Sequence, residues 1–135
     1  MSKSTMSAFT TFTRVAGVNN TLASFYPQSG NQERISSGNV SLNCYHTKLV
    51  TVDGPAEVHM GPATQHGQMK KLYLAFKGTD DADMTVVIPS LLGTFDEIVF
   101  KEEGDFALLQ WSGGAWIVLE TGNSGGNPSG APIVQ

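Results

Sequence analysis

The chain has few of the features that several common kinds of protein depend on. It contains a single cysteine, Cys44, so no internal disulfide can form. Charged residues make up 15% of the sequence, below the roughly one quarter that is usual for globular domains. No apolar run is long enough to span a bilayer, and none follows Lys3 as it would in a signal peptide. We therefore expect no membrane partner, and a protein that is made in the cytoplasm and leaves it only by lysis or inside an assembly.

The single cysteine is expected to be a small apolar residue in a strand, because free cysteines are among the most buried residues. A catalytic thiol would need a neighbouring base and a positive environment. His46 lies two residues away and would share a face with Cys44 in a strand. The pair is the alternative to a purely structural role.

The charges are unevenly distributed along the chain. Residues 1–79 hold seven basic and three acidic residues, and residues 80–135 hold one basic and nine acidic residues. Solubility alone could explain this asymmetry. It could also orient neighbouring copies, basic half to acidic half, since complementary charges set register at interfaces. The basic residues are scattered and form no stripe, so nucleic acid is not an expected partner.

The clearest structural signal is a β-hairpin in residues 104–120. Two apolar, aromatic runs flank the turn Ser112-Gly113-Gly114, where glycines allow positive φ. The two tryptophans of the chain, Trp111 and Trp116, stand on either side of that turn. Because both lie among apolar neighbours, we expect them to anchor the core.

Further short strands are expected upstream, separated by turn residues. The pattern predicts strands over 40–45, 46–52, 57–60, 68–77, 84–88 and 97–101, and it shows no helical period. In the strand over 68–77, Leu72, Leu74 and Phe76 share one face, and Tyr73 and Ala75 lie on the other. These features predict an all-β fold, an antiparallel β-sandwich or barrel-like domain of seven to eight strands.

The two ends of the chain differ in composition from this domain. We expect an extended N-terminal arm over residues 1–37, a β-sandwich over 38–122 and a flexible tail over 123–135. The arm is polar but carries recurring apolar residues, which predict that it packs on another surface. The tail ends on a short apolar tip that could contact a neighbour. The interface candidates in these segments are Phe9, Phe12, Val15, Leu22, Phe25, Tyr26, Ile133 and Val134.

No segment carries a convincing catalytic or cofactor signature, so the expected protein is not an enzyme and binds no cofactor or metal. Residues 122–126 match a nucleophile-elbow pattern around Ser124, but no helix follows and no later histidine completes a triad. The acidic residues near 80–83 and 102–105 lack the spacing of a calcium loop. The three histidines lack the close spacing of a zinc site.

Lys70 and Lys71 begin the strand that follows Gly67-Gln68. A pair of lysines at this position is typical of a solvated strand edge, where charge discourages pairing with other chains. The alternative is contact with a phosphate or an acidic partner, and both residues are therefore interface candidates.

Strand and turn motifs along residues 38–122 form a recognisable series. Gly67-Gln68 and a basic pair lead into an apolar strand, an acidic turn precedes Thr85-Val86 and Pro89, and a Gly-Asp–apolar–Trp ending closes the series. The segments concerned are 45–49, 66–74, 84–89, 95–100, 104–111 and 114–119. This pattern resembles a module of structural proteins from tailed phages and large marine viruses.

The resemblance implies a non-enzymatic virion component: a compact β-domain that often assembles as trimers. A capsid decoration (cement) protein is the leading interpretation. Its partners would be the major capsid protein and two further copies of itself, and it would lie on the capsid surface after assembly in the host cytoplasm. The arm would lie over the shell protein. Its aromatic residues Phe9, Phe12, Phe25 and Tyr26 would anchor it there, because aromatic residues dominate interface energetics.

Three other functions stay open at this point. A tail, spike or fibre domain would bind a host receptor or glycan through its loops. A carbohydrate-binding β-sandwich would use Trp111 or Trp116 as a stacking platform. A small esterase would use Ser124 as its nucleophile.

Overall fold

The computed structural model describes residues 32–126 and 130–135, and every regular element in these residues is a β-strand. The predicted all-β class is confirmed for this part of the chain, in which no helix occurs. In chain order the strands are β2 (Gln32–Ile35), β3 (His46–Thr51), β4 (Ala56–His59), β5 (Met69–Lys77), β6 (Met84–Val87), β7 (Glu97–Phe100), β8 (Asp105–Trp111), β9 (Trp116–Asn123) and β10 (Ile133–Val134).

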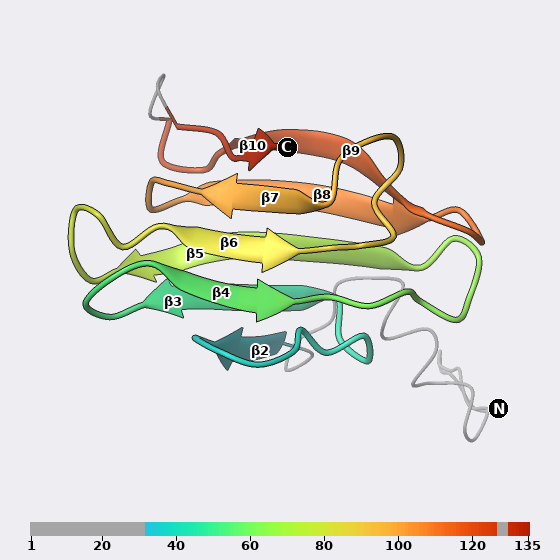
Figure 1. The fold of residues 1–135 in the computed structure, drawn as a ribbon, viewed down its shortest axis with the longest axis horizontal. Helices are drawn as coiled ribbons and strands as arrows, with labels where there is room; N and C mark the ends of the chain where they lie inside the picture. The colour runs from blue at the N-terminus through green and yellow to red at the C-terminus, as the bar shows by residue number, and fades with distance from the viewer. Residues whose placement is uncertain (1–31, 127–129) are drawn as a thin grey trace, which may run out of the picture.

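The strands form two sheets that lie one in front of the other (Figure 1). One sheet has the order β10-β7-β6-β4, and the other has the order β2-β3-β5-β8-β9. Buried side chains of both sheets meet in one core cluster, which includes Val58 and Phe100 from the first sheet and Leu49 and Leu72 from the second. Burying each such side chain contributes about 1.5–3 kcal/mol, which is why the two sheets stack.

The predicted antiparallel arrangement is wrong, because both sheets are mixed. Strand β3 pairs in parallel with both β2 and β5, and β4 pairs in parallel with β6. The antiparallel pairs are β5 with β8, β8 with β9, β6 with β7, and β10 with β7.

Alternation of the chain between the two sheets explains the parallel pairs. From β3 the chain crosses to β4 in the other sheet, returns to β5 and crosses again to β6. Parallel neighbours need a long crossover connection, and here a strand of the opposite sheet serves as that crossover. A turn between two short strands looks the same in sequence whether the chain stays in its sheet or leaves it.

The segment over residues 40–45, predicted as a strand, is an irregular connection between β2 and β3. The start of this connection lies beside the end of β4: Asn39 forms a parallel β-bridge with His59, and the Val40 amide donates to the His59 carbonyl. Further along, hydrogen bonds from side chains hold the connection where backbone pairing is absent. The Glu33 carboxylate accepts from the Ser41 backbone amide at 2.7 Å, and the Gln68 side-chain amide donates to the Leu42 carbonyl.

Parts of the predicted arm and tail belong to the sheets. Strand β2 lies within the arm expected over residues 1–37, and it forms one edge of the five-stranded sheet. Strand β10 lies within the tail expected over residues 123–135 and pairs with β7. Both strands are short, with four residues in β2 and two in β10, so their pairing depends on neighbours that a local pattern does not reveal.

The predicted tryptophan hairpin is confirmed, with Trp111 opposite Trp116 and Gly113 at φ 96° in the turn. The two indoles make an edge-to-face contact with centroids 5.4 Å apart. Trp116 is fully buried, and its Nε1 donates to the Gly61 carbonyl at 2.9 Å. Its backbone amide also donates to the Ser90 carbonyl. Trp116 therefore ties the five-stranded sheet to loops that follow strands of the other sheet.

Replacing Trp116 with Phe should lower the free energy of unfolding by about 2–4 kcal/mol, because the change opens a cavity and leaves the Gly61 carbonyl without its donor. Urea unfolding followed by circular dichroism measures this loss. Trp111→Phe is the matched control, since no such bond from Trp111 occurs in the described residues, and it should cost less. Equal losses in the two variants would contradict the assigned role of the Trp116 bond.

Candidate binding face on the five-stranded sheet

The candidate site is the outer face of the five-stranded sheet, which the other sheet leaves uncovered. Strands β3, β5 and β8 each alternate strictly between buried and half-buried residues over most of their length. Side chains of a strand point to opposite faces in turn, so the buried set faces the core and the half-buried set faces outward. Because β5 lies between β3 and β8, the outward sets of all three strands form one surface.

One row across this face combines a lysine with two aromatic rings. Lys48 of β3 lies opposite Tyr73 of β5, and Tyr73 lies opposite Phe106 of β8. Phe106 in turn lies opposite Gly122 of β9. A Cβ at Gly122 would come within 3.0 Å of two Phe106 ring atoms, so the glycine makes room for the ring to lie across β9.

The next row joins two basic residues to a leucine. His46 of β3 lies opposite Lys71 of β5, which lies opposite Leu108 of β8. The two rows also touch each other. The Lys71 Nζ lies 5.4 Å from the centroid of the Phe106 ring, and the His46 and Tyr73 ring centroids are 5.8 Å apart. A lysine ammonium in this position is attracted to the aromatic ring by about 0.5–1 kcal/mol at an exposed site.

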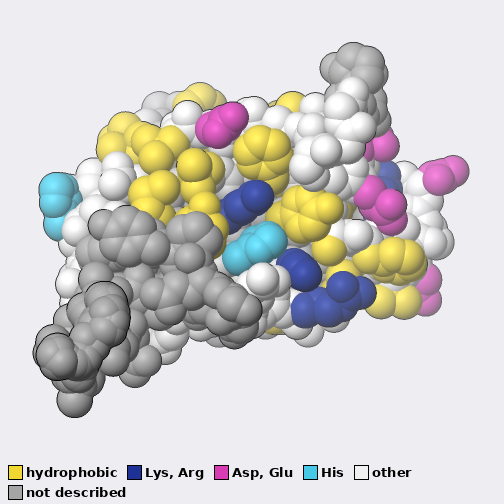
Figure 2. Space-filling model, turned by 180° about the vertical axis from the view of Figure 1, so that it is seen from behind, with side chains coloured by type: hydrophobic (Ala, Val, Ile, Leu, Met, Phe, Trp, Pro, Cys, Tyr) yellow, Lys and Arg dark blue, Asp and Glu magenta, His cyan; other side chains and the backbone are white. Residues whose placement is uncertain are grey.

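The described side chains on this face are mainly apolar and basic, and Glu120 of the edge strand β9, opposite Leu108, is an acidic exception. Figure 2 views the molecule from this side and shows Lys and His side chains among hydrophobic ones, with acidic side chains toward the rim. Met69, Gln110 and Ile117 form a third row. Such a surface can bind a protein that offers apolar and acidic groups, because the rings supply contact area and the lysines supply charge complementarity.

His46 is the titratable group at the centre of this face. Burial lowers its pKa below the ordinary value of 6.5, and the ammonium groups of Lys71, Lys48 and Lys70 lower it further. Its Nε2 is buried and has no hydrogen-bond partner among the described residues. Protonation would therefore place an unpaired charge beside three lysines, and the folded state holds His46 in its neutral form at neutral pH.

This shift predicts an acid sensitivity that belongs to His46. The unfolded chain takes up the proton near pH 6.5, but the folded protein does so only at lower pH, so stability falls as the pH drops through that window. His46→Gln should lose less thermal stability than the wild type between pH 7.5 and pH 5. Melting temperatures measured across this range test the difference. Parallel curves for the two proteins would refute the assignment.

Lys70 and Lys71, for which the sequence predicts either a solvated strand edge or a contact with a partner, have different surroundings. Strand β5 is in the middle of its sheet, so neither residue lies at an edge. Lys71 belongs to the outer face, as described above. Lys70 is fully buried, in phase with Leu72 and Leu74, and its ammonium donates to the carbonyls of Ser41 and Cys44. The prediction of a surface role for Lys70 is therefore wrong, because strand alternation turns its side chain inward.

The remaining interface candidates lie elsewhere. Ile133 and Val134 form β10, where they pair with Val99 and Ile98 of the same chain, and Val134 packs against the core cluster. Ile133 is 44% exposed. The six arm candidates lie outside the described residues: Phe9, Phe12, Val15, Leu22, Phe25 and Tyr26.

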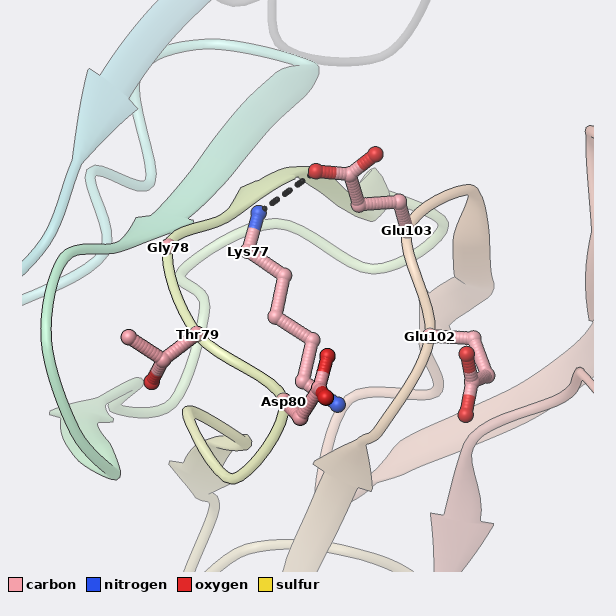
Figure 3. A pocket seen from close by; sticks show the side chains of 6 residues that line it. All are labelled: Lys77, Gly78, Thr79, Asp80, Glu102 and Glu103. Atoms are coloured by element: carbon pink, nitrogen blue, oxygen red, sulfur yellow. Dashed lines mark hydrogen bonds between the residues drawn. The ribbon is translucent and has the colours of Figure 1, made fainter.

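Three of the acidic residues singled out in the sequence, Asp80, Glu102 and Glu103, line an open polar hollow of about 360 Å³ (Figure 3). The Lys77 amide donates to the Glu103 carboxylate at 2.9 Å, and the Lys77 ammonium pairs with Asp83 at 3.4 Å. The described part of the chain holds no group of three or more His, Cys, Asp or Glu side chains that could bind a metal ion. The hollow is lined by Lys77, Gly78, Thr79, Asp80, Glu102 and Glu103.

The other residues weighed in the sequence have structural surroundings. Trp111 and Trp116 are buried, so neither ring presents a face to a carbohydrate, and the expectation that they belong to the core is confirmed. Cys44 is also buried, but outside any strand. Ser124 follows β9 and donates its hydroxyl to the Gly104 carbonyl. Within residues 32–126 and 130–135, no helix has the length and apolar character needed to cross a membrane.

No protein-family model matches the chain, and a search of curated proteins finds no significant match.

The sequence pattern separates Tyr73 from Leu72 and Leu74 on its strand but does not identify the binding face. The alternation over residues 69–75 carried the signal for Lys71 and Tyr73. Their neighbours His46, Lys48 and Phe106 come from strands that are far away in the chain. Only the order and register of β3, β5 and β8 bring these side chains together.

Proposed function

We propose that this protein is a capsid decoration (cement) protein, a β-sandwich that binds the outer shell of a virus as a homotrimer and stabilises it. The observation that carries the proposal is the apolar and basic outer face of the five-stranded sheet, where Lys48, Lys71, Tyr73 and Phe106 are held by sheet register. A broad surface of this composition suits attachment to another protein. The two stacked sheets are compatible with the sandwich that the virion-module resemblance implies.

The position of β2 supports a joint role for the arm and the face. Residues 1–31 are joined to β2, and β2 is the edge strand of the sheet that carries the face. The arm is therefore tethered at the border of the candidate surface. A partner bound to the face lies within reach of the arm's apolar residues, so both can engage the major capsid protein at once. Burial across junctions between capsomers would then reinforce the shell.

The face predicts which variants lose attachment. In virus particles that contain the protein, its copy number should be comparable to that of the shell protein by quantitative mass spectrometry.

The double variant Lys71→Ser/Tyr73→Ser should bind shells that lack the decoration protein at least about tenfold more weakly than the wild type does. The matched control is Glu57→Ser/Thr85→Ser, which alters the outer face of the four-stranded sheet. Equal binding by both variants would argue against this face.

The arm is tested separately. A chain lacking residues 1–31 but retaining β2 should keep its β-type circular dichroism spectrum and lose particle binding, because the arm's aromatic anchors are gone. Light scattering coupled to size exclusion reports whether the full chain is a trimer. Undiminished particle binding by the truncated chain would exclude the arm as an attachment element.

A tail, spike or fibre domain is the second candidate. The half-buried Tyr73 and Phe106 rings beside lysines also offer a surface on which a host glycan could stack. A handful of copies per particle, together with glycan binding that Tyr73→Ser abolishes, would favour this function over decoration.

A further inference from the structure

The buried lysine and the cysteine of this chain are in direct contact. The Lys70 Nζ lies 3.4 Å from the Cys44 Sγ, and both residues are buried. Cys44 belongs to the irregular connection over residues 40–45, whereas Lys70 belongs to the central strand β5. The contact therefore joins a loop to the middle of the five-stranded sheet.

The Lys70 ammonium is held without a carboxylate. Its donors reach the Ser41 carbonyl at 2.7 Å, the Cys44 carbonyl at 2.9 Å and the Cys44 sulfur. No ion pair with Lys70 occurs in the described part of the chain. Burial lowers the pKa of Lys70 from its usual value, although Cys44 and Glu33 act in the opposite direction. The neutral amine, which is the nucleophilic form of lysine, is therefore more accessible here than on the surface.

We propose that Cys44 and Lys70 are a site of oxidative modification, where hydrogen peroxide converts the pair into a covalent Sγ–Nζ cross-link. No second cysteine is present to form an internal disulfide with an oxidised Cys44. Lys70 is the nitrogen nucleophile already in contact with that sulfur. Sulfenic acids condense with nitrogen nucleophiles to form sulfenamides, and the fold supplies such a nucleophile at contact distance.

The reaction needs one equivalent of peroxide and proceeds in two steps. The Cys44 sulfur attacks the peroxide, so that an S–O bond forms, the O–O bond breaks and one water leaves after proton transfer. The neutral Lys70 amine then attacks the sulfenic sulfur, an S–N bond forms and the S–O bond breaks to release a second water. Cys44 is oxidised by two electrons and peroxide is reduced. One proton is released overall when Lys70 starts as an ammonium.

The surroundings favour Lys70 over the other lysines. Lys71 is adjacent in sequence, but its side chain lies on the opposite face, over the Phe106 ring. Hydrogen bonds from Gln68 to Leu42 and from Ser41 to Glu33 hold the loop against the sheet near Lys70. The loop belongs to no strand, so a covalent bond at this point would fix it to β5.

The experiment uses the full-length folded protein and hydrogen peroxide, followed by a thiol-alkylating reagent and intact mass spectrometry. The expected product has lost two hydrogen atoms and resists alkylation. Trypsin should yield a peptide in which Cys44 and Lys70 are joined, and dithiothreitol should release it. The oxidised protein should also melt at a higher temperature than the reduced protein, because the link closes a loop of the chain.

The controls separate this cross-link from ordinary thiol oxidation. Cys44→Ser and Lys70→Met should not form it, and Lys71→Met should form it as the wild type does. Wild-type protein unfolded in urea should gain oxygen at Cys44 and form no link. Peptide mapping of the wild-type protein tests the link even if one of these variants does not fold. Four results would overturn the proposal: unchanged mass, oxygen added to Cys44 with Lys70 still cleavable by trypsin, a link to another lysine, or a disulfide between two chains.

Discussion

The packing of Trp116 between the two sheets is the constraint on which the rest of the fold depends. Its ring meets Trp111 within the hairpin, its Nε1 reaches the Gly61 carbonyl, and its backbone pairs with the Ser90–Leu92 connection. In this chain the strands of one sheet are connected through strands of the other. Strands β3 and β5 are parallel neighbours only because β4, which comes between them in the chain, packs in the opposite sheet. Inter-sheet packing therefore maintains pairing within each sheet as well as burial between them.

The same arrangement produces the candidate binding face. Burial against the four-stranded sheet uses one set of alternating side chains from β3, β5 and β8, and the other set is turned outward. Three adjacent strands then hold lysines, a histidine and aromatic rings in fixed rows. A surface built on central strands is pre-ordered, so little conformational entropy is lost when a partner binds. Gly122 contributes by leaving space for Phe106 where a side chain would displace the ring.

The contact between Lys70 and Cys44 shows how a polar group is accommodated behind this face. The lysine occupies an inward position of β5, and carbonyl groups of the preceding loop and a sulfur satisfy its donors. A buried ammonium without partners would be strongly destabilising. The irregular loop over residues 40–45 is thus required for Lys70 to be buried, and in return Lys70 fixes the path of the loop. The binding face and the Cys44–Lys70 pair lie on the two sides of the same strand.

Local sequence patterns were enough to predict two features of this protein. The alternation around Tyr73 separated the side chains of its strand into two faces, and the Trp111–Trp116 spacing with Gly113 predicted the hairpin, because both signals lie within a few residues. The partners of each strand were decided by the tertiary structure. Nothing local in residues 46–51 indicates parallel pairing with residues 69–77, and nothing local in Lys70 reveals the carbonyl groups that receive it. These contacts join residues more than twenty positions apart, and only the packing of the two sheets brings them together.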